Sequence, residues 1–360
     1  MQSVTQALHL YQKNKSKMAT YILIKFILVL FVFLLALTVA AYSTYGERKV
    51  SALMQDRIGP DRAGPYGLLQ PLADGIKMFT KEELIPSNSS KYLFVLGPSI
   101  AMLTALMAGV VIPWAGPIEA FGQQLTFQVS DINIGILYIF SVVSIGVYGI
   151  MIGGWASNNK YSLLGALRAS SQMISYEIAM GLAIVALVMK SGTLSLGEIV
   201  TQQQGDWINA LYQPLGFLIF LICAFAETNR APFDLPECET ELIGGYHTEY
   251  SSMKLGLFLF AEYINMFVSS AVISALYFGG YNLPFQAALG LEGVWLAVLQ
   301  FGFFFLKIVF FIFFFMWVRW TIPRFRYDQL LHLGWKILLP LAILNIIITG
   351  LVMWANGSLA

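Results

Sequence analysis

The sequence has little charge, little cysteine and almost no excess of either charge sign. Of its 360 residues, only 11% are charged and 58% are hydrophobic, whereas a soluble domain has about 25% charged residues. This composition excludes an ordinary soluble protein. A net charge of +1 without a basic run excludes nucleic-acid binding, which requires clustered cations. Cys223 and Cys238 are too few to build a disulfide framework, an iron–sulfur cluster or a structural zinc site.

Long apolar runs dominate the sequence instead. A membrane-spanning helix needs about 20 mostly apolar residues, and eight stretches meet or nearly meet this length: 21–45, 92–113, 132–155, 173–189, 211–228, 255–278, 294–318 and 337–355. The first is longer than the apolar core of a signal peptide, which spans about 7–15 residues, so we interpret it as a retained span. The sequence predicts an all-α polytopic membrane protein, with about eight transmembrane helices in a single domain over residues 1–360.

The basic residues predict the orientation. Loops after odd-numbered spans hold fifteen of the 21 basic residues, whereas loops after even-numbered spans hold only Lys190. Because cytoplasmic loops are enriched in Lys and Arg, we expect loops 46–91, 156–172, 229–254 and 319–336 in the cytoplasm and both termini on the outer side. Lys13, Lys15 and Lys17 locally oppose this orientation. The Glu47-Arg48-Lys49 triplet is typical of a topological anchor at a helix end.

The first cytoplasmic loop contains a helix-like stretch from Pro71 to Glu83. Leu68, Leu72, Ile76 and Phe79 recur at helical spacing and would share one face. This pattern favours an amphipathic helix lying in the membrane interface. A surface helix that only seals the protein would show the same stripe.

The third cytoplasmic loop is unusually acidic. Residues 226–250 hold six acids, with Arg230 as the only Lys or Arg: Glu227, Asp234, Glu237, Glu239, Glu241 and Glu249. Acidic residues contribute little to topology, and crowded, partly buried carboxylates are typical of functional sites. A solvated acidic loop is the alternative. Glu227 and Arg230 are three residues apart and could pair on a last helical turn.

A few charged residues also fall within the apolar runs. Glu262 lies inside the sixth run, while Glu177 and Glu227 lie at the cytoplasmic ends of the fourth and fifth. A charged side chain at mid-bilayer costs about 2.5–3.5 kcal/mol on insertion scales, so such acids indicate either a proton path or a buried bond between helices. Lys307 in the seventh run is a possible counter-ion, whereas the third run has no acid and Ser144 is among its few polar residues.

Segments 47–82, 153–177 and 226–263 resemble the three signature regions of the H subunit of respiratory complex I, and the resemblance extends over residues 21–355. It implies a membrane subunit of a proton-pumping NADH:quinone oxidoreductase. Such a subunit forms much of the quinone chamber at the junction with the hydrophilic arm, whose own subunits hold the flavin and the iron–sulfur clusters. The helix at 71–83, with the first and sixth spans, is implied to frame the quinone entrance.

The resemblance also implies roles for individual residues. Those expected around the quinone chamber are Arg48, Asp74, Arg230, Asp234, Glu237, Glu239 and Glu241, and those expected on a proton path are Glu177, Glu227 and Glu262. Ubiquinone or menaquinone is the expected substrate, with no metal, flavin or cluster bound by this chain alone. The expected partners are the other membrane subunits, the quinone-site subunits of the hydrophilic arm and membrane lipid.

Four functions compete on the sequence alone. The leading hypothesis is a subunit that couples quinone reduction to proton translocation in a bacterial cytoplasmic membrane. The rivals are the related component of a membrane-bound hydrogenase, an independent ion transporter and a structural anchor. Transporters often show broken helices and repeated halves, and neither is evident in the sequence.

Overall fold

A computed structural model of the chain describes residues 2–120, 123–205, 207–234, 243–284, 286, 290 and 293–356. Within these residues, seven helices are long and apolar enough to cross a membrane. They are α1 (Gln2–Met54), α3 (Lys91–Ala108), α4 (Gly135–Ala156), α5 (Lys160–Ser191), α10 (Ser252–Tyr277), α12 (Gly293–Thr321) and the continuous segment formed by α13 (Tyr327–His332), a π-helical turn (Leu333–Leu338) and α14 (Leu339–Ala355). The predicted all-α polytopic class is confirmed.

The remaining apolar run forms a broken helix. α7 (Asn209–Tyr212) and α8 (Pro214–Glu227) meet at Gln213, whose backbone is not helical at φ −131° and ψ 64°. The 14 residues of α8 span about 21 Å at 1.5 Å per residue, which is less than the apolar thickness of about 30 Å. α8 alone is therefore too short to cross the apolar layer.

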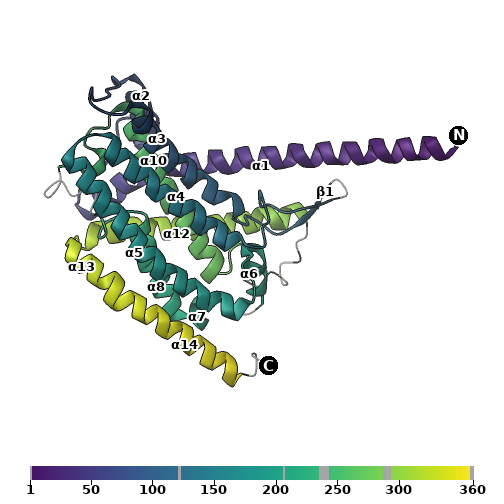
Figure 1. Ribbon diagram of the computed structural model, residues 1–360. Helices are drawn as coiled ribbons and strands as arrows, with labels where there is room; N and C mark the ends of the chain where they lie inside the picture. Colours follow the sequence, from purple (N-terminus) through teal and green to yellow (C-terminus); the bar gives the residue numbers. More distant parts are fainter. Residues whose placement is uncertain are drawn as a thin grey trace.

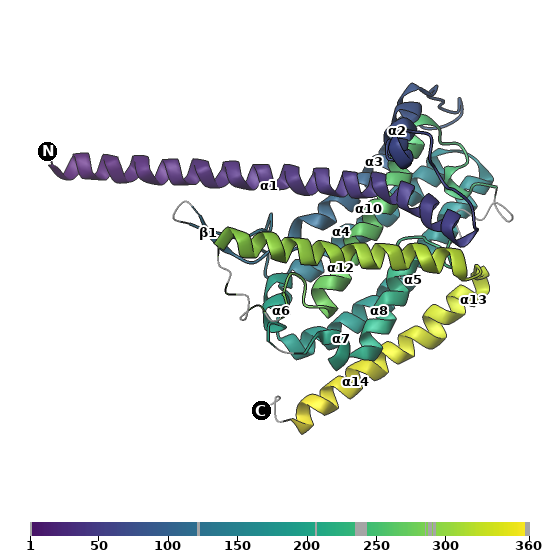
Figure 2. The same cartoon turned by 180° about the vertical axis from the view of Figure 1, so that it is seen from behind.

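The other described elements are short. They are the 3₁₀ turns Pro65–Gly67, Gly109–Val111 and Gly245–His247, the helices α2 (Gln70–Thr80) and α6 (Leu196–Gln202), and the antiparallel strands β1 (Ile118–Ala120) and β2 (Gln123–Leu125), in which Ile118 pairs with Leu125. In Figures 1 and 2, α2 and α13 lie at one end of the bundle, and β1, α6 and both chain ends lie toward the other. This arrangement is the one expected when eight apolar segments alternate in direction.

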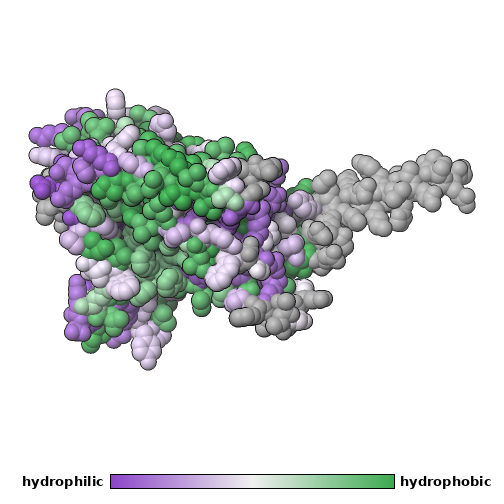
Figure 3. Space-filling model, turned by 90° about the horizontal axis from the view of Figure 1, so that it is seen from below, coloured by the Kyte–Doolittle hydropathy of each residue, from purple (hydrophilic) through white to green (hydrophobic). Residues whose placement is uncertain are grey.

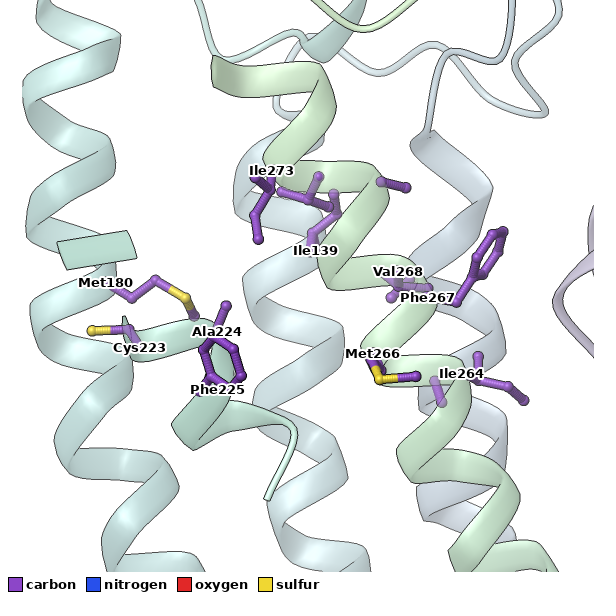
Figure 4. Packing of buried hydrophobic residues seen from close by; sticks show 14 of the residues in the cluster. Ile139, Met180, Cys223, Ala224, Phe225, Ile264, Met266, Phe267, Val268 and Ile273 are labelled. Atoms are coloured by element: carbon purple, nitrogen blue, oxygen red, sulfur yellow. The ribbon is translucent and has the colours of Figure 1, made fainter. Parts of the chain in front are cut away.

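α10 is the central helix of the bundle. It contacts α1, α3 and α12, and 67% of its most apolar window is buried. By contrast, 11% of the corresponding window of α1 is buried, because α1 lies along the outside and extends well past the other helices (Figure 1). Figure 4 shows part of the core, where Met180 of α5 lies beside Cys223 of α8, and Ile264 to Ile273 line α10.

Several helices differ in extent from the sequence expectation. α1 runs from Gln2 to Met54, beyond both ends of the predicted span 21–45, so residues 46–54 of the predicted first loop are helical. α5 begins at Lys160, with the Asn159 side chain accepting a hydrogen bond from the Tyr161 amide, so most of the predicted loop 156–172 is helical. The polar residues in this stretch hid it from hydropathy. In the first loop, α2 ends at Thr80, and its apolar side chains Leu72 and Phe79 are 63% and 72% exposed, as an interfacial helix requires.

The protein surface has the character of a membrane protein. Hydrophobic side chains cover much of the face in Figure 3, and hydrophilic ones are most concentrated at its left end. The exposed apolar side chains of α14 include Ile347, Leu351 and Val352, which face outward along its length. The chain is therefore a multi-pass membrane protein whose outer helices present apolar surface to lipid or to neighbouring subunits.

Candidate functional site

Glu47 is the centre of a buried ionic network. It lies near the end of α1 and is 6% exposed. Its carboxylate pairs with Arg319 of α12 at 2.6 Å and with Arg230 at 3.3 Å, and it accepts a hydrogen bond from the Tyr263 hydroxyl at 2.7 Å. One buried carboxylate thus joins α1, α10, α12 and the segment after α8, which satisfies the requirement that buried charges be paired.

Arg230 reaches this network because it lies in the turn that follows α8. The helix stops at Glu227, and Asn229 takes a left-handed conformation with φ 49°. The Arg230 guanidinium lies 4.0 Å from the centre of the Tyr263 ring and 4.0 Å from the Glu262 carboxylate. The predicted pairing of Glu227 with Arg230 on a last helical turn is therefore wrong, since the turn at Asn229 directs Arg230 toward α1 and α10.

A cavity of about 270 Å³ opens beside Glu47. Arg48 and Asp74, both expected around the quinone chamber, line it and form an ion pair at 2.7 Å. Tyr263 and Arg319 also line it. The polar groups of this cavity come from α1, α2, α10 and α12, so its shape depends on how these four helices pack.

A second, more apolar cavity of about 460 Å³ adjoins the first. The two share Ala41, Pro71, Gly75, Met78 and Phe260. The second is lined further by leucines of α1, α2 and α10, including Leu37, Leu72 and Leu257. An apolar space between α1, α2 and α10 thus leads toward a polar one that contains Glu47, Arg48 and Asp74.

The network continues inward through Glu262 and Tyr246. Glu262 of α10 is 6% exposed and accepts a hydrogen bond from the Tyr246 hydroxyl at 2.9 Å. Both residues line a small cavity of about 20 Å³ that Glu227 also lines. A cavity needs about 10–15 Å³ to hold one water, so this space, which Glu262 and Glu227 both line, has room for water.

Glu227 is buried without a protein hydrogen-bond partner. It is 5% exposed, and within the described part of the chain neither carboxylate oxygen has a partner. An unpaired buried carboxylate is costly, so this group requires a water, a proton or both. It lies at the end of α8, beside the small cavity that Glu262 also lines.

Glu177 lies on α5, which packs against α8. Its carboxylate accepts a hydrogen bond from the Ser144 hydroxyl of α4. The third apolar run, which has no acid of its own, therefore contributes a hydroxyl next to the carboxylate of the fourth. The three acids expected on a proton path thus come from the neighbouring helices α5, α8 and α10.

Lys307 has hydrogen-bond partners of an unexpected kind. Its ammonium group donates to the carbonyl oxygens of Phe278 and Gly280, each at 2.7 Å. The sequence suggested a counter-ion for a carboxylate, but the described hydrogen bonds of Lys307 are to the backbone at the end of α10. The Lys307 ammonium group binds these carbonyl oxygens because the turn after α10 leaves carbonyl groups without amide partners.

Asp234 lies apart from the Arg48–Asp74 cavity. It is 3% exposed and pairs with Arg324, which follows α12, at 3.2 Å. Glu237, Glu239 and Glu241, expected to continue the chamber, lie outside the described residues. The structure therefore brings together Arg48 with Asp74, Arg230 with Glu262, and Asp234 with Arg324.

Sequence reasoning assigned no site role to Glu47, Tyr246, Tyr263 or Arg319. Glu47 was visible only as part of a charged triplet at a helix end. Its neighbour Arg48 pairs with Asp74 of α2, while Glu47 binds Arg230, 183 residues away in the sequence. An acid next to two basic residues was the only available signal.

These features define a polytopic membrane protein in which a half-polar cavity connects with a buried line of ionisable groups. The chain matches the NADH dehydrogenase family over residues 25–350. It is 71% identical over 330 residues to the H subunit 1 of the NADH-quinone oxidoreductase of Cytophaga hutchinsonii, covering 92% of this chain and 96% of the relative. It is 63% identical over 335 residues to the H subunit of the same enzyme of Flavobacterium psychrophilum, covering 92% and 98%.

A more distant relative, the H subunit 1 of the NADH-quinone oxidoreductase of Geobacter metallireducens, is 48% identical over 322 residues, covering 89% of this chain and 94% of the relative. The chain therefore belongs to the NADH dehydrogenase family, as a homologue of the H subunit of the NADH-quinone oxidoreductase complex. This confirms the resemblance found in the sequence and the expectation of a subunit of an oxidoreductase complex.

Proposed function

We propose that the chain forms much of a quinone-binding chamber in a proton-translocating NADH:quinone oxidoreductase, and that its buried carboxylates couple quinone reduction to proton movement. Ubiquinone or menaquinone is the substrate, and flavin and iron–sulfur clusters belong to other subunits. The partners are the remaining membrane subunits and the quinone-site subunits of a hydrophilic arm. The membrane is the bacterial cytoplasmic membrane, with both termini on the outer side.

The two adjoining cavities support the quinone part of the proposal. A quinone has a polar head and a long apolar tail. The space between α1, α2 and α10 is likewise polar in one cavity and apolar in the other. The tail would occupy the apolar cavity beside Leu37 and Leu72. The head would lie near Arg48 and Asp74, where hydrogen-bond donors and acceptors are available.

The contact between Glu47, Arg230 and Glu262 is the single observation that carries the coupling part. It joins the polar cavity to the buried acids through distances of 3.3 Å and 4.0 Å. A change of charge at the cavity would alter the ion pair between Glu47 and Arg230. It would thereby alter the electric field at Glu262 and Glu227. Neither carboxylate oxygen of Glu227 has a hydrogen-bond partner among the described residues. Its protonation would therefore respond most strongly to this change of field. The disturbance would then pass to proton-carrying subunits beyond Glu177.

The rival functions are less well supported by the same features. A component of a membrane-bound hydrogenase would have no need of an apolar cavity that adjoins the polar one at Arg48. An independent transporter often has broken helices and repeated halves. The chain has a broken helix at Gln213, which the sequence did not reveal, but no repeated half is evident in its sequence. A purely structural anchor would leave the unpaired carboxylate of Glu227 unexplained.

The test is Glu227→Gln in the assembled complex. Glutamine has nearly the same shape but cannot bind or release a proton, so we expect loss of proton translocation, of quinone reductase activity, or of both. The measurement is NADH oxidation with quinone, sensitive to a quinone-site inhibitor, together with the proton gradient in proteoliposomes. Glu198→Gln is the matched control, because Glu198 lies on α6 and lines none of these cavities.

A Glu227→Gln variant with parental activity and parental coupling would remove Glu227 from the pathway. Purification of the chain as a lone oligomer that conducts ions would contradict the quinone function as a whole.

A further inference from the structure

A large cavity lies at the opposite end of the bundle from the proposed chamber. It has a volume of about 770 Å³ and lies between the end of α5, the α7–α8 junction and the C-terminal half of α14. Lys190, Tyr212, Gln213 and Asn345 supply its main polar groups, and Ile348 is among its apolar residues. Neither of the cavities assigned to quinone shares a residue with it.

Lys190 is fixed at the rim of this cavity. It lies in the last turn of α5, where its ammonium group is 3.4 Å from the centre of the Tyr212 ring and 3.0 Å from the Asn209 side-chain oxygen. It is also the only basic residue in the loops after even-numbered spans. Topology does not account for a lysine there, because such loops normally lack Lys and Arg.

Two residues that line this cavity each have a buried polar atom without a partner. Within the described residues, Gln213 Oε1 and Asn345 Nδ2 have no hydrogen-bond partner, although the two side chains are only 6% and 4% exposed. Both atoms lie beside the first turn of α8, at 3.4 Å and 3.0 Å from the position that a Cβ on Gly216 would take. One is an acceptor and the other a donor, so a ligand that satisfies both must offer a donor and an acceptor.

The start of α8 adds a third attraction for an anion. Because α8 begins at Pro214 after the break at Gln213, its positive end lies inside the bundle, beside the cavity. The first amide groups of a helix have no intrahelical partner, and such ends bind phosphate and carboxylate groups. Gln213 makes no side-chain cap bond there, so the end is not closed by that side chain.

We propose that this cavity binds one membrane phospholipid whose headgroup carries both a phosphate and a hydrogen-bond donor. The phosphate lies between Lys190 and the first turn of α8 and accepts from Asn345, and a headgroup hydroxyl or ammonium donates to Gln213. The acyl chains follow α14 along Ile348 and Val352, which are 45% and 53% exposed. Basic residues between transmembrane helices bind lipid headgroups, and here Lys190 supplies the cation beside the apolar side chains of α14.

A helix of a neighbouring subunit fits these groups less well. Its backbone amides and carbonyls are already paired within the helix, so it leaves Gln213 Oε1 and Asn345 Nδ2 unsatisfied unless a polar side chain happens to enter. The site does not depend on the proposed quinone function, and its test measures bound lipid rather than activity.

The experiment uses the purified assembly that contains the chain, depleted of loosely bound lipid and examined by native mass spectrometry. It is titrated with phosphatidylglycerol, phosphatidylethanolamine or phosphatidylcholine. We expect phosphatidylglycerol or phosphatidylethanolamine to be retained over phosphatidylcholine, whose headgroup has no donor. Lys190→Met and Asn345→Leu should each retain one lipid fewer than the parent. Lys160→Met is the matched control, since Lys160 is at the other end of α5 and also lies over a tyrosine ring.

Equal retention of the three lipids, or parental retention by both variants, would overturn the proposal. Should Asn345→Leu fail to assemble, Lys190→Met still tests it, because Lys190 lies at the rim. A photoreactive side chain at Ile348 provides an independent reading: we expect a lipid adduct, and an adduct with another subunit would contradict the site.

Discussion

At the residue scale, Glu47 links four parts of the molecule through one carboxylate. It binds Arg230, Arg319 and Tyr263, and its burial makes each bond depend on the others. A buried ion pair contributes little net stability compared with apolar packing, but removing one partner leaves an uncompensated charge. Glu47 is therefore a group whose loss affects the fold as well as the proposed coupling.

We expect Glu47→Gln to lower the free energy of unfolding by about 3–5 kcal/mol, the usual cost of breaking a buried pair on one side. Thermal unfolding of the purified assembly in detergent measures the effect. Asp328→Asn is the control, since Asp328 and Arg326 form an exposed pair at 3.7 Å with side chains 72% and 71% exposed, which is worth at most about 1 kcal/mol. Equal shifts for the two variants would show that Glu47 is not held as described.

At the element scale, α3 and α4 pack through glycine. A Cβ on Gly149 would lie 2.9 Å from the Ala101 amide nitrogen and 2.9 Å from the Gly97 carbonyl oxygen. Gly153 lies one turn further along α4 against the same helix, since a Cβ on Gly97 would meet its backbone at 2.8 Å. Small residues four apart allow helices to approach this closely in membranes, and this pair of helices forms one wall of the cavity at Glu227.

We expect Gly149→Leu to force α3 away from α4 and to destabilise the bundle by about 1–3 kcal/mol, the range for overpacking. The loss is read as a lower midpoint of thermal unfolding and a lower yield of assembled complex. Gly181→Leu on α5 is the control, because nothing lies within 4 Å of a Cβ at Gly181. A parental yield and midpoint for Gly149→Leu would contradict the close approach.

At the scale of the whole molecule, the arrangement of α1, α2 and α10 leaves a side opening in the bundle. α1 lies along the outside of the bundle (Figure 2), and α2 returns against it and against α10. Gly75 of α2 lines both adjoining cavities, and nothing lies within 4 Å of a Cβ built on it. A larger side chain at Gly75 can therefore fill the passage without displacing the backbone.

We expect Gly75→Trp to reduce the rate with a long-tailed quinone by about tenfold or more, equivalent to about 1.4 kcal/mol at the barrier. NADH oxidation with a water-soluble artificial acceptor should remain at the parental rate, because that reaction does not use the membrane cavity. Gly302→Trp on α12, with nothing within 4 Å of its Cβ, is the control. Parental quinone kinetics in Gly75→Trp would exclude this opening as the route.

Local patterns along the chain were enough to establish the all-α polytopic class, the family and the residues at which acids enter the apolar runs. These properties depend on composition and on patterns within about 20 residues, which hydropathy and motifs report directly. The partners of the buried charges, by contrast, emerged only from the packed bundle: Glu47 for Arg230, Ser144 for Glu177, and backbone carbonyls for Lys307. Glu47 is 183 positions from Arg230 and 216 positions from Tyr263 in the sequence. No local pattern encodes such pairs, because they follow from how the helices pack. The break at Gln213 likewise borders the proposed lipid site only because α5 and α14 pack beside it.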